Sequence, residues 1–87
     1  MLDQMQQDNR LAVMAIVVED SSCVEALNAL LHEYRSYIIG RMGIPYPPRD
    51  VSLISVAVDA PSDEISALTG KLGRIEGLTV KTAYSKS

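Results

Sequence analysis

The amino-acid sequence predicts an α+β fold, a ferredoxin-like plait in which a four-stranded antiparallel sheet carries two helices on one face. Its segments follow the order strand, helix, strand, strand, helix, strand, that is βαββαβ. Both strand–helix–strand crossovers must be right-handed, and the plait satisfies this. The first and third strand segments are apolar on both faces, as expected of the two central strands. We therefore expect a single domain over residues 11–87, preceded by a flexible tail at residues 1–10, which are polar and lack periodicity.

The first strand and the first helix are expected at residues 11–18 and 22–36. The strand segment LAVMAIVV has eight apolar residues without a break, which is too short for a typical helix. Ser22 and Glu25 have the spacing of a capping box at the start of the helix. An apolar stripe with spacings of three and four residues then follows, formed by Val24, Leu27, Leu30, Leu31 and Tyr34.

The second and third strands are expected at residues 37–45 and 51–59. Their connection is rich in proline, with Pro45, Pro47 and Pro48. In a structural interpretation, these prolines end an edge strand and remove N–H donors with which stray chains could pair. In a functional interpretation, an effector binds beside the same connection.

The second helix is expected at residues 62–75 and the fourth strand at residues 78–84. Gly77 ends the helix, and the strand alternates apolar and polar residues as if one face were wet. The buried stripe of the helix is Ile65, Leu68, Leu72 and Ile75. A second strip of this helix holds only small residues: Ser66, Ala67, Gly70 and Gly73. Such a strip suits close contact with another helix or chain, or else it marks a helix that loosens near its end.

Charge and composition exclude several classes of function. The net charge is −3 and the eight basic residues are scattered, which argues against direct nucleic-acid binding, since that needs clustered Lys and Arg. No apolar run approaches the roughly 20 residues that span a bilayer, so no membrane association is expected. Cys23 is the only cysteine, which indicates a reducing compartment. A cytoplasmic protein is expected.

Catalytic and metal sites are not expected either. The sequence shows no nucleophile with a base at a recognisable spacing and no glycine loop for phosphate, so we predict no enzyme activity, no catalytic residues and no cofactor. Cys23 and His32 are nine residues apart on the first helix, on opposite sides and about 13 Å apart along its axis. One chain therefore cannot hold a metal ion between them.

Two helices cover only one face of a four-stranded sheet, so the other face needs a partner. Side chains on that open face would leave an apolar patch larger than monomers usually expose. We therefore expect a homodimer or a dimer of dimers, assembled through residues such as Met14, Ile16 and Leu53 or their neighbours. The sequence does not decide which alternate residues face away from the helices.

Three segments, IIGRMGIPY, VSLISVAVD and DEISALTGKLGRIEGLTVK, resemble a small ACT-like family labelled as regulators of the iron-only hydrogenase system. This family is related in fold to the sensing domain of nickel-responsive regulators. The resemblance runs from Arg10 to Lys86 and is most specific at residues 40–46 and 63–77. It implies an ACT-like domain with a regulatory role and a regulatory protein partner. The chain departs from amino-acid-binding ACT domains in the first loop, which has no glycine and reads Glu19, Asp20, Ser21 and Ser22.

The resemblance also implies where an effector binds, because ACT-like dimers hold effectors at strand edges and their loops. Five residues would bind a small anionic or polar effector across an interface between two copies. They supply a guanidinium (Arg41), a bare backbone (Gly43), an aromatic ring (Tyr46) and two hydroxyls (Ser21 and Ser22). The function expected is that of a small effector-sensing regulatory module. Two alternatives stay open: a purely structural oligomerisation domain without ligand, and an Arg41 that only pairs with Glu19 or Asp20 across subunits.

Overall fold

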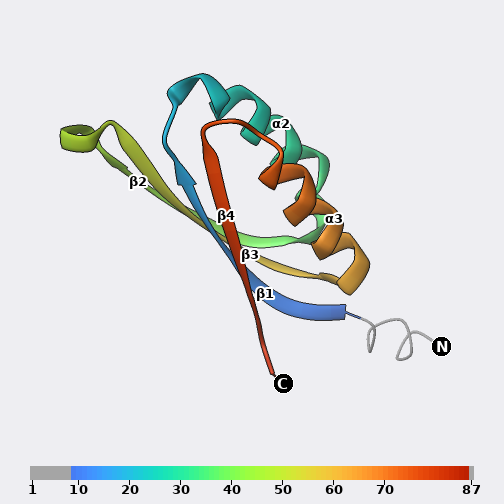
Figure 1. Ribbon diagram of the computed structural model, residues 1–87. Helices are drawn as coiled ribbons and strands as arrows, with labels where there is room; N and C mark the ends of the chain where they lie inside the picture. Colours follow the sequence, from blue (N-terminus) through green and yellow to red (C-terminus); the bar gives the residue numbers. More distant parts are fainter. Residues whose placement is uncertain (1–8, 87) are drawn as a thin grey trace.

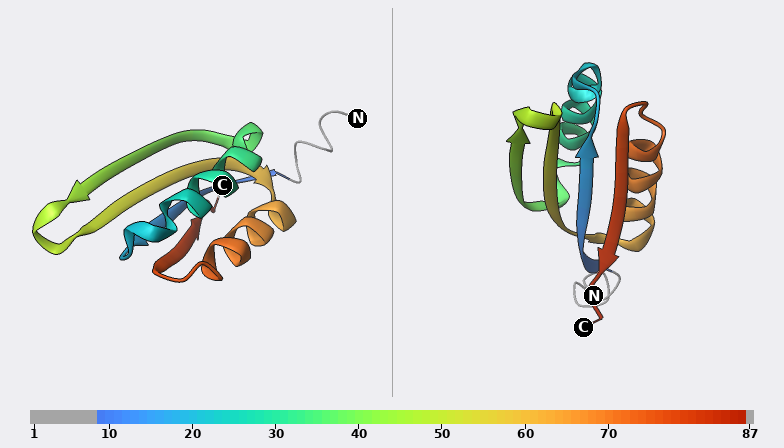
Figure 2. Two further views of the ribbon diagram at one scale, coloured as in Figure 1. Left: turned by 90° about the horizontal axis from the view of Figure 1, so that it is seen from above. Right: turned by 60° about the vertical axis from the view of Figure 1, so that its left-hand side comes forward.

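The computed structural model describes residues 9–86 and contains one antiparallel sheet with its strands in the order β2–β3–β1–β4 (Figures 1 and 2). The strands are β1 (Asn9–Val18), β2 (Ile38–Tyr46), β3 (Val51–Pro61) and β4 (Leu78–Tyr84). The helices α2 (Val24–Glu33) and α3 (Ser62–Gly73) cover the same face of the sheet. β1 and β3 pair antiparallel at the centre. The predicted plait is confirmed, and so are its two central strands.

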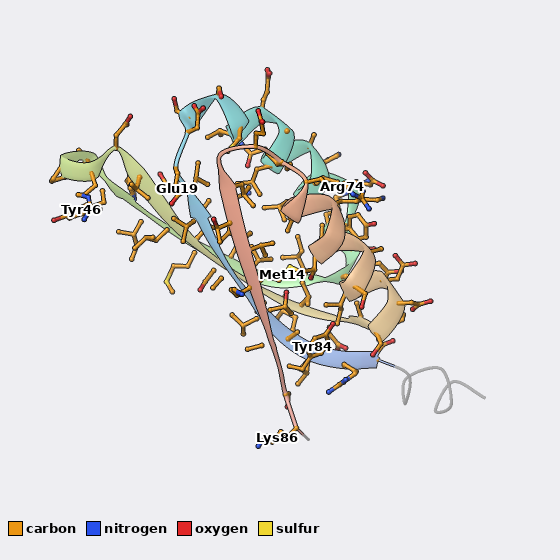
Figure 3. All side chains as sticks on the ribbon, viewed as in Figure 1. Met14, Glu19, Tyr46, Arg74, Tyr84 and Lys86 are labelled. Carbon is orange, nitrogen blue, oxygen red and sulfur yellow. The ribbon has the colours of Figure 1, made fainter. Side chains whose placement is uncertain are left out.

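The core lies between the helices and one face of the sheet. Alternate residues of β1 point into it, as Met14 does in Figure 3, and the buried positions of this strand are Ala12, Met14, Ile16 and Val18. The helices contribute most of the stripes predicted for them, and the residues buried there are Leu27, Leu31 and Tyr34 on the first stripe and Ile65, Leu68 and Leu72 on the second. These stripes face the sheet because a 3.6-residue period keeps them on one side of each helix.

Beyond the core lies the opposite, uncovered face of the sheet, which we call the open face. Cross-strand partners point to the same face, so the register of the sheet assigns its residues. Met14 and Ile16, named in the prediction of the open face, are instead buried beneath the helices, whereas Leu53 is on the open face with Val13 and Val17. The large exposed apolar side chains on this side of the sheet are Leu11, Val13, Ile39, Met42, Ile44, Tyr46 and Leu53.

The first strand begins earlier than predicted. Asn9 and Arg10 belong to β1, because β3 continues to Pro61 and supplies partners for both. The Arg10 guanidinium also lies 4.6 Å from the ring centre of Tyr84 and donates a hydrogen bond to the Ser85 carbonyl at 3.3 Å. The predicted tail is therefore wrong for residues 9 and 10, and its remainder, residues 1–8, lies outside the described residues.

The first helix is shorter than the predicted 22–36 and starts differently. A 3₁₀ turn, Ser21–Cys23, precedes α2, and a second one, Arg35–Tyr37, follows it. The capping box is wrong: the Asp20 carboxylate accepts a hydrogen bond from the Ser22 N–H at 3.0 Å, so the cap is Asp20, two residues before the predicted Ser22. Val24 begins α2 with its side chain 39% exposed, and so does not join the buried stripe.

The β2–β3 hairpin forms an arm that extends away from the helices (Figure 1). Every residue from Ile39 to Asp50 is exposed. β2 is an edge strand and contains Pro45, which an edge tolerates because its missing N–H would face outward. At the end of the arm a 3₁₀ turn, Pro47–Arg49, leads to Asp50, whose φ of 53° and ψ of 43° are left-handed. No helix in the described part of the chain is long and apolar enough to cross a membrane.

Candidate functional site

A cleft of about 220 Å³ lies between the end of the arm and the body of the domain. One wall comes from the end of β1 and the start of α2, and the other from the two strands of the arm and the turn between them. Its lining is Val18, Ser21, Val24, Pro45, Tyr46, Pro47, Asp50, Val51 and Ser52. We call it the arm cleft. Its position explains why Val24 is exposed: this residue lines the cleft and does not contact the core.

The polar groups of the arm cleft are not engaged with the rest of the domain. Within residues 9–86, the Asp50 carboxylate and the hydroxyls of Ser21 and Ser52 have no hydrogen bond or ion pair. Apolar groups make up most of the remaining wall, chiefly Val18, Val51 and the prolines. The cleft therefore combines an apolar surface with a few hydrogen-bonding groups that are free to bind a ligand.

Two of the five predicted effector residues line this cleft, Ser21 and Tyr46. Tyr46 lies at the far end of the arm in Figure 3 and also borders a second hollow on the open face, beside Glu19 and Arg49. The structure thus brings the first loop and the arm together within a single chain.

The other three predicted residues point elsewhere. Arg41 pairs with Val56 and so lies on the helix side of β2, where its guanidinium donates to the Asn28 side chain at 2.9 Å. Gly43 is on the same side, and a Cβ there would be 3.6 Å from the Ile54 side chain. Ser22 is held in the turn by the Asp20 carboxylate. That all five residues meet across two copies of the chain stays a prediction.

The first loop carries a carboxylate whose pKa is shifted. The backbone hydrogen bond from Ser22, followed by the Ser22 side chain, lowers the pKa of Asp20, because both stabilise its ionised form. This carboxylate is occupied in capping the turn. It fixes the backbone on which Ser21 is presented to the cleft.

Asp50 and Ser52 are functional candidates that the sequence prediction missed. One signal was present: an aspartate between a proline-rich turn and a strand is among the few residues that tolerate a left-handed backbone. What the sequence could not show is that this turn lines one cleft with Ser21 and Val24, about 26 to 29 residues earlier in the chain.

Metal ligands do not gather anywhere in residues 9–86: no group of three His, Cys, Asp or Glu side chains is placed to hold an ion. Cys23 is buried, with its sulfur 3.8 Å from the Gly77 carbonyl oxygen, and His32 is exposed on α2. Neither residue belongs to such a group within residues 9–86.

Comparison with known proteins places this geometry in a family. No curated protein matches the chain. Among solved structures, the uncharacterized protein TM1266 from Thermotoga maritima is 34% identical, with a TM-score of 0.86 over 90% of this chain and 99% of that one.

Two more distant structures share the fold. The ACT domain from GTP pyrophosphokinase of Chlorobium tepidum is 15% identical, with a TM-score of 0.68 over 92% of this chain and 90% of that domain. A formyltetrahydrofolate deformylase from Pseudomonas putida KT2440 is 14% identical, with a TM-score of 0.60, and the match spans 90% of this chain but 30% of the enzyme.

The model of one protein family matches residues 10–82, which is most of the chain. The ACT-like fold, the match to TM1266 and this family model agree with one another. The protein therefore belongs to the TM1266-like family, whose description is "Iron-only hydrogenase system regulator, putative".

Proposed function

We propose that this protein is a small effector-sensing regulatory module that acts as a homo-oligomer and regulates an iron-only hydrogenase system. The family description supports the regulatory role, and the likeness to an ACT domain supports a binding module over an enzyme. The deformylase match does not argue for catalysis, since it spans less than a third of that enzyme. A partner protein is part of the proposal, because the plait in residues 9–86 contains no helix pair of the kind that reads DNA.

The observation that carries the proposal is the uncovered apolar open face. Its seven large apolar side chains are between 46% and 66% exposed. Because complete burial of one such side chain contributes about 1.5–3 kcal/mol, covering the exposed half contributes roughly 1 kcal/mol each. A symmetric pair would gain about 14 kcal/mol, against an association cost of about 4–15 kcal/mol. The gain matches or exceeds the cost over nearly all of this range, so the balance favours a dimer.

A second copy of the chain is the occupant that this face fits. The strands place only two charged residues among the apolar ones, Asp59 and Lys81, and their charges are opposite. Glu19 and Arg49, at the hollow on this face, add a second acid and a second base. In a two-fold arrangement each surface meets its own copy, so an apolar face with equal numbers of acids and bases at its border is self-complementary. A highly charged partner would find little to pair with.

The arm cleft supports the sensing part of the proposal. It borders the open face, because Tyr46 and Val51 line both the cleft and the neighbouring hollow on that face. A ligand in the cleft would therefore contact residues that the second copy also covers. This is the arrangement needed for a small molecule to change assembly, since it must bind one state more tightly than the other.

Light scattering coupled to size-exclusion chromatography tests the assembly. The wild type is expected at a multiple of 9.5 kDa, and Leu53→Lys is expected as a monomer, because it would bury an unpaired ammonium group in the interface. Ala29→Lys, on the exposed side of α2, is the control and should assemble normally. A wild type that runs as a monodisperse monomer at micromolar concentration would overturn the proposal.

Native mass spectrometry of the purified oligomer tests the sensing. A small molecule retained by the wild type is the expected result. If the oligomer forms but carries no ligand under any condition, the structural oligomerisation domain is the better description.

A further inference from the structure

From the chemistry of the arm cleft we infer the class of its effector: a small organic cation, such as an amine or a quaternary ammonium compound, with Asp50 as its counter-ion. This inference rests on the proposed sensing function and adds to it the charge, the size and the polar partners of the ligand.

Charge is the first argument. Asp50 is the one charged residue in the cleft lining. Two nearby arginines point away: Arg41 donates to Asn28 on the helix side, and Arg49 lines the hollow on the open face. An anion would enter the cleft without a cationic partner, whereas an ammonium group would find a carboxylate that is otherwise unpaired within residues 9–86.

The walls fit the body of such a ligand. Tyr46 is among the lining residues, and the faces of tyrosine rings attract cations. Val18, Val24 and Val51 supply apolar surface for alkyl groups, and the Ser21 and Ser52 hydroxyls can accept N–H hydrogen bonds. A volume of about 220 Å³ is below that of sites for drug-sized molecules. The ligand is therefore expected to be small.

The backbone at Asp50 is a further argument. This is the one non-glycine residue among those described that has a positive φ, 53°. Glycine adopts this conformation without strain, so the turn alone does not require a carboxylate. Strained positions of this kind gather at binding sites, where the side chain has a role that outweighs the strain. Here the carboxylate is brought to the cleft wall opposite Ser21.

Binding of three probes would test the inference: n-butylammonium, choline, and butyrate as an anion of the same size as the first. The assay is the shift of backbone amide resonances of the full-length ¹⁵N-labelled protein, titrated at constant ionic strength because salt screens exposed charges. We expect the two cations to shift the amides of Ser21, Tyr46 and Ser52, and butyrate to leave them in place. Asp50→Asn, which keeps the shape and tolerates the left-handed backbone, should weaken cation binding at least tenfold.

The matched control is Asp63→Asn, which makes the same chemical change at the start of α3, at the other end of β3 from Asp50. It should bind the cations as the wild type does. If Asp50→Asn binds the cations equally well, Asp50 is not their counter-ion and the inference is overturned. If butyrate shifts the same amides as n-butylammonium, the cation is the wrong class, although sensing in the cleft survives. If no probe shifts these amides and the native protein carries no small molecule, both the inference and the proposed sensing fall.

Discussion

Replacing Gly77 by alanine is expected to destabilise the domain strongly. Gly77 has a φ of 84°, and an L residue in the left-handed region costs about 1–2 kcal/mol. A Cβ atom there would lie 2.6 Å from the Asp20 Cβ, closer than two carbon atoms can approach, and overpacking typically costs about 1–3 kcal/mol. The lower chain entropy of alanine in the unfolded state offsets about 0.4–1 kcal/mol. The expected net loss is about 2–4 kcal/mol.

The loop that carries Asp20 cannot simply move away from the new methyl group. The Gly77 carbonyl accepts a hydrogen bond from the Glu19 N–H at 2.7 Å, and the Asp20 carbonyl accepts one from the Cys23 N–H at 3.0 Å. A domain of this size has a total stability of about 4–13 kcal/mol. Thermal unfolding, followed by circular dichroism at one fixed protein concentration because assembly raises Tm, should therefore show a Tm lowered by roughly 8–30 °C.

Gly70→Ala is the matched control for this prediction. Gly70 lies in α3, where a Cβ would meet nothing nearer than the Arg74 guanidinium at 4.0 Å, so alanine should stabilise the helix by up to about 1 kcal/mol. In an additional variant, Asp20→Gly is introduced into the Gly77→Ala protein, where it removes the opposing Cβ. Asp20→Gly should lower the free energy of unfolding less in that protein than in the wild type. If the free energy of unfolding of the Gly77→Ala protein is within about 0.5 kcal/mol of the wild-type value, which is the range of ordinary surface substitutions, the reasoning is refuted.

Three further predictions concern the loop, the arm and the sheet. Asp20→Asn should make the loss of stability in acid less steep. The pKa of Asp20 is lowered in the folded state, so the ionised carboxylate stabilises the fold at neutral pH, and this stabilisation is lost as pH falls through that pKa. A plot of Tm against pH that is the same for variant and wild type would contradict this. Arg41→Ala should lower the free energy of unfolding by less than about 1 kcal/mol, because it removes one exposed hydrogen bond. It should also leave the ligand-induced amide shifts unchanged. If those shifts are lost, Arg41 is part of the binding site. Thr82→Val should cost about 1 kcal/mol in urea unfolding by leaving the Thr69 hydroxyl without its 2.9 Å partner, and Thr69→Val with Thr82→Val should cost less than the two single changes combined.

Element order and strand pairing followed from the sequence because they depend on local patterns that survive folding. The fourth strand, predicted at residues 78–84, has those bounds, and the second helix ends two residues earlier than predicted. The errors lie at the start of β1, at the end of β3 and at both ends of the first helix, and β2 is displaced by one residue. At the start of β1 the outcome depends on distant partners, because Pro61 and Ala60 pair with residues 9 and 10, and local spacing cannot report this pairing. At the start of the first helix the competitor is local: the Asp20 carboxylate, two residues before Ser22, accepts the Ser22 N–H hydrogen bond.

The candidate site was predicted less well, for a related reason. Ser21 and Tyr46 were chosen for their chemistry and do line one cleft, but Arg41 and Gly43 were chosen from the same stretch of β2 without knowing the face to which each points. The bulge between Ile38 and Gly40 shifts the register of the strand that follows it. One residue of shift moves every later side chain to the opposite face. A strand with apolar and small residues on both sides gives no internal signal of such a shift.

Which alternate residues of a strand face the helices also decides which of them belong to the core and which to the predicted interface. Val13 and Met14 are neighbours in an unbroken apolar strand, yet Met14 is fully buried under the helices and Val13 is 47% exposed. What decides between them is the connection after β1: Val18 must point inward where the chain turns into Ser21–Cys23 and α2, and alternation then sets every earlier residue of the strand. An apolar residue retained at Val13 is not explained by the core. It is explained if the open face is covered, which is why the oligomeric state of Leu53→Lys bears on the whole length of β1.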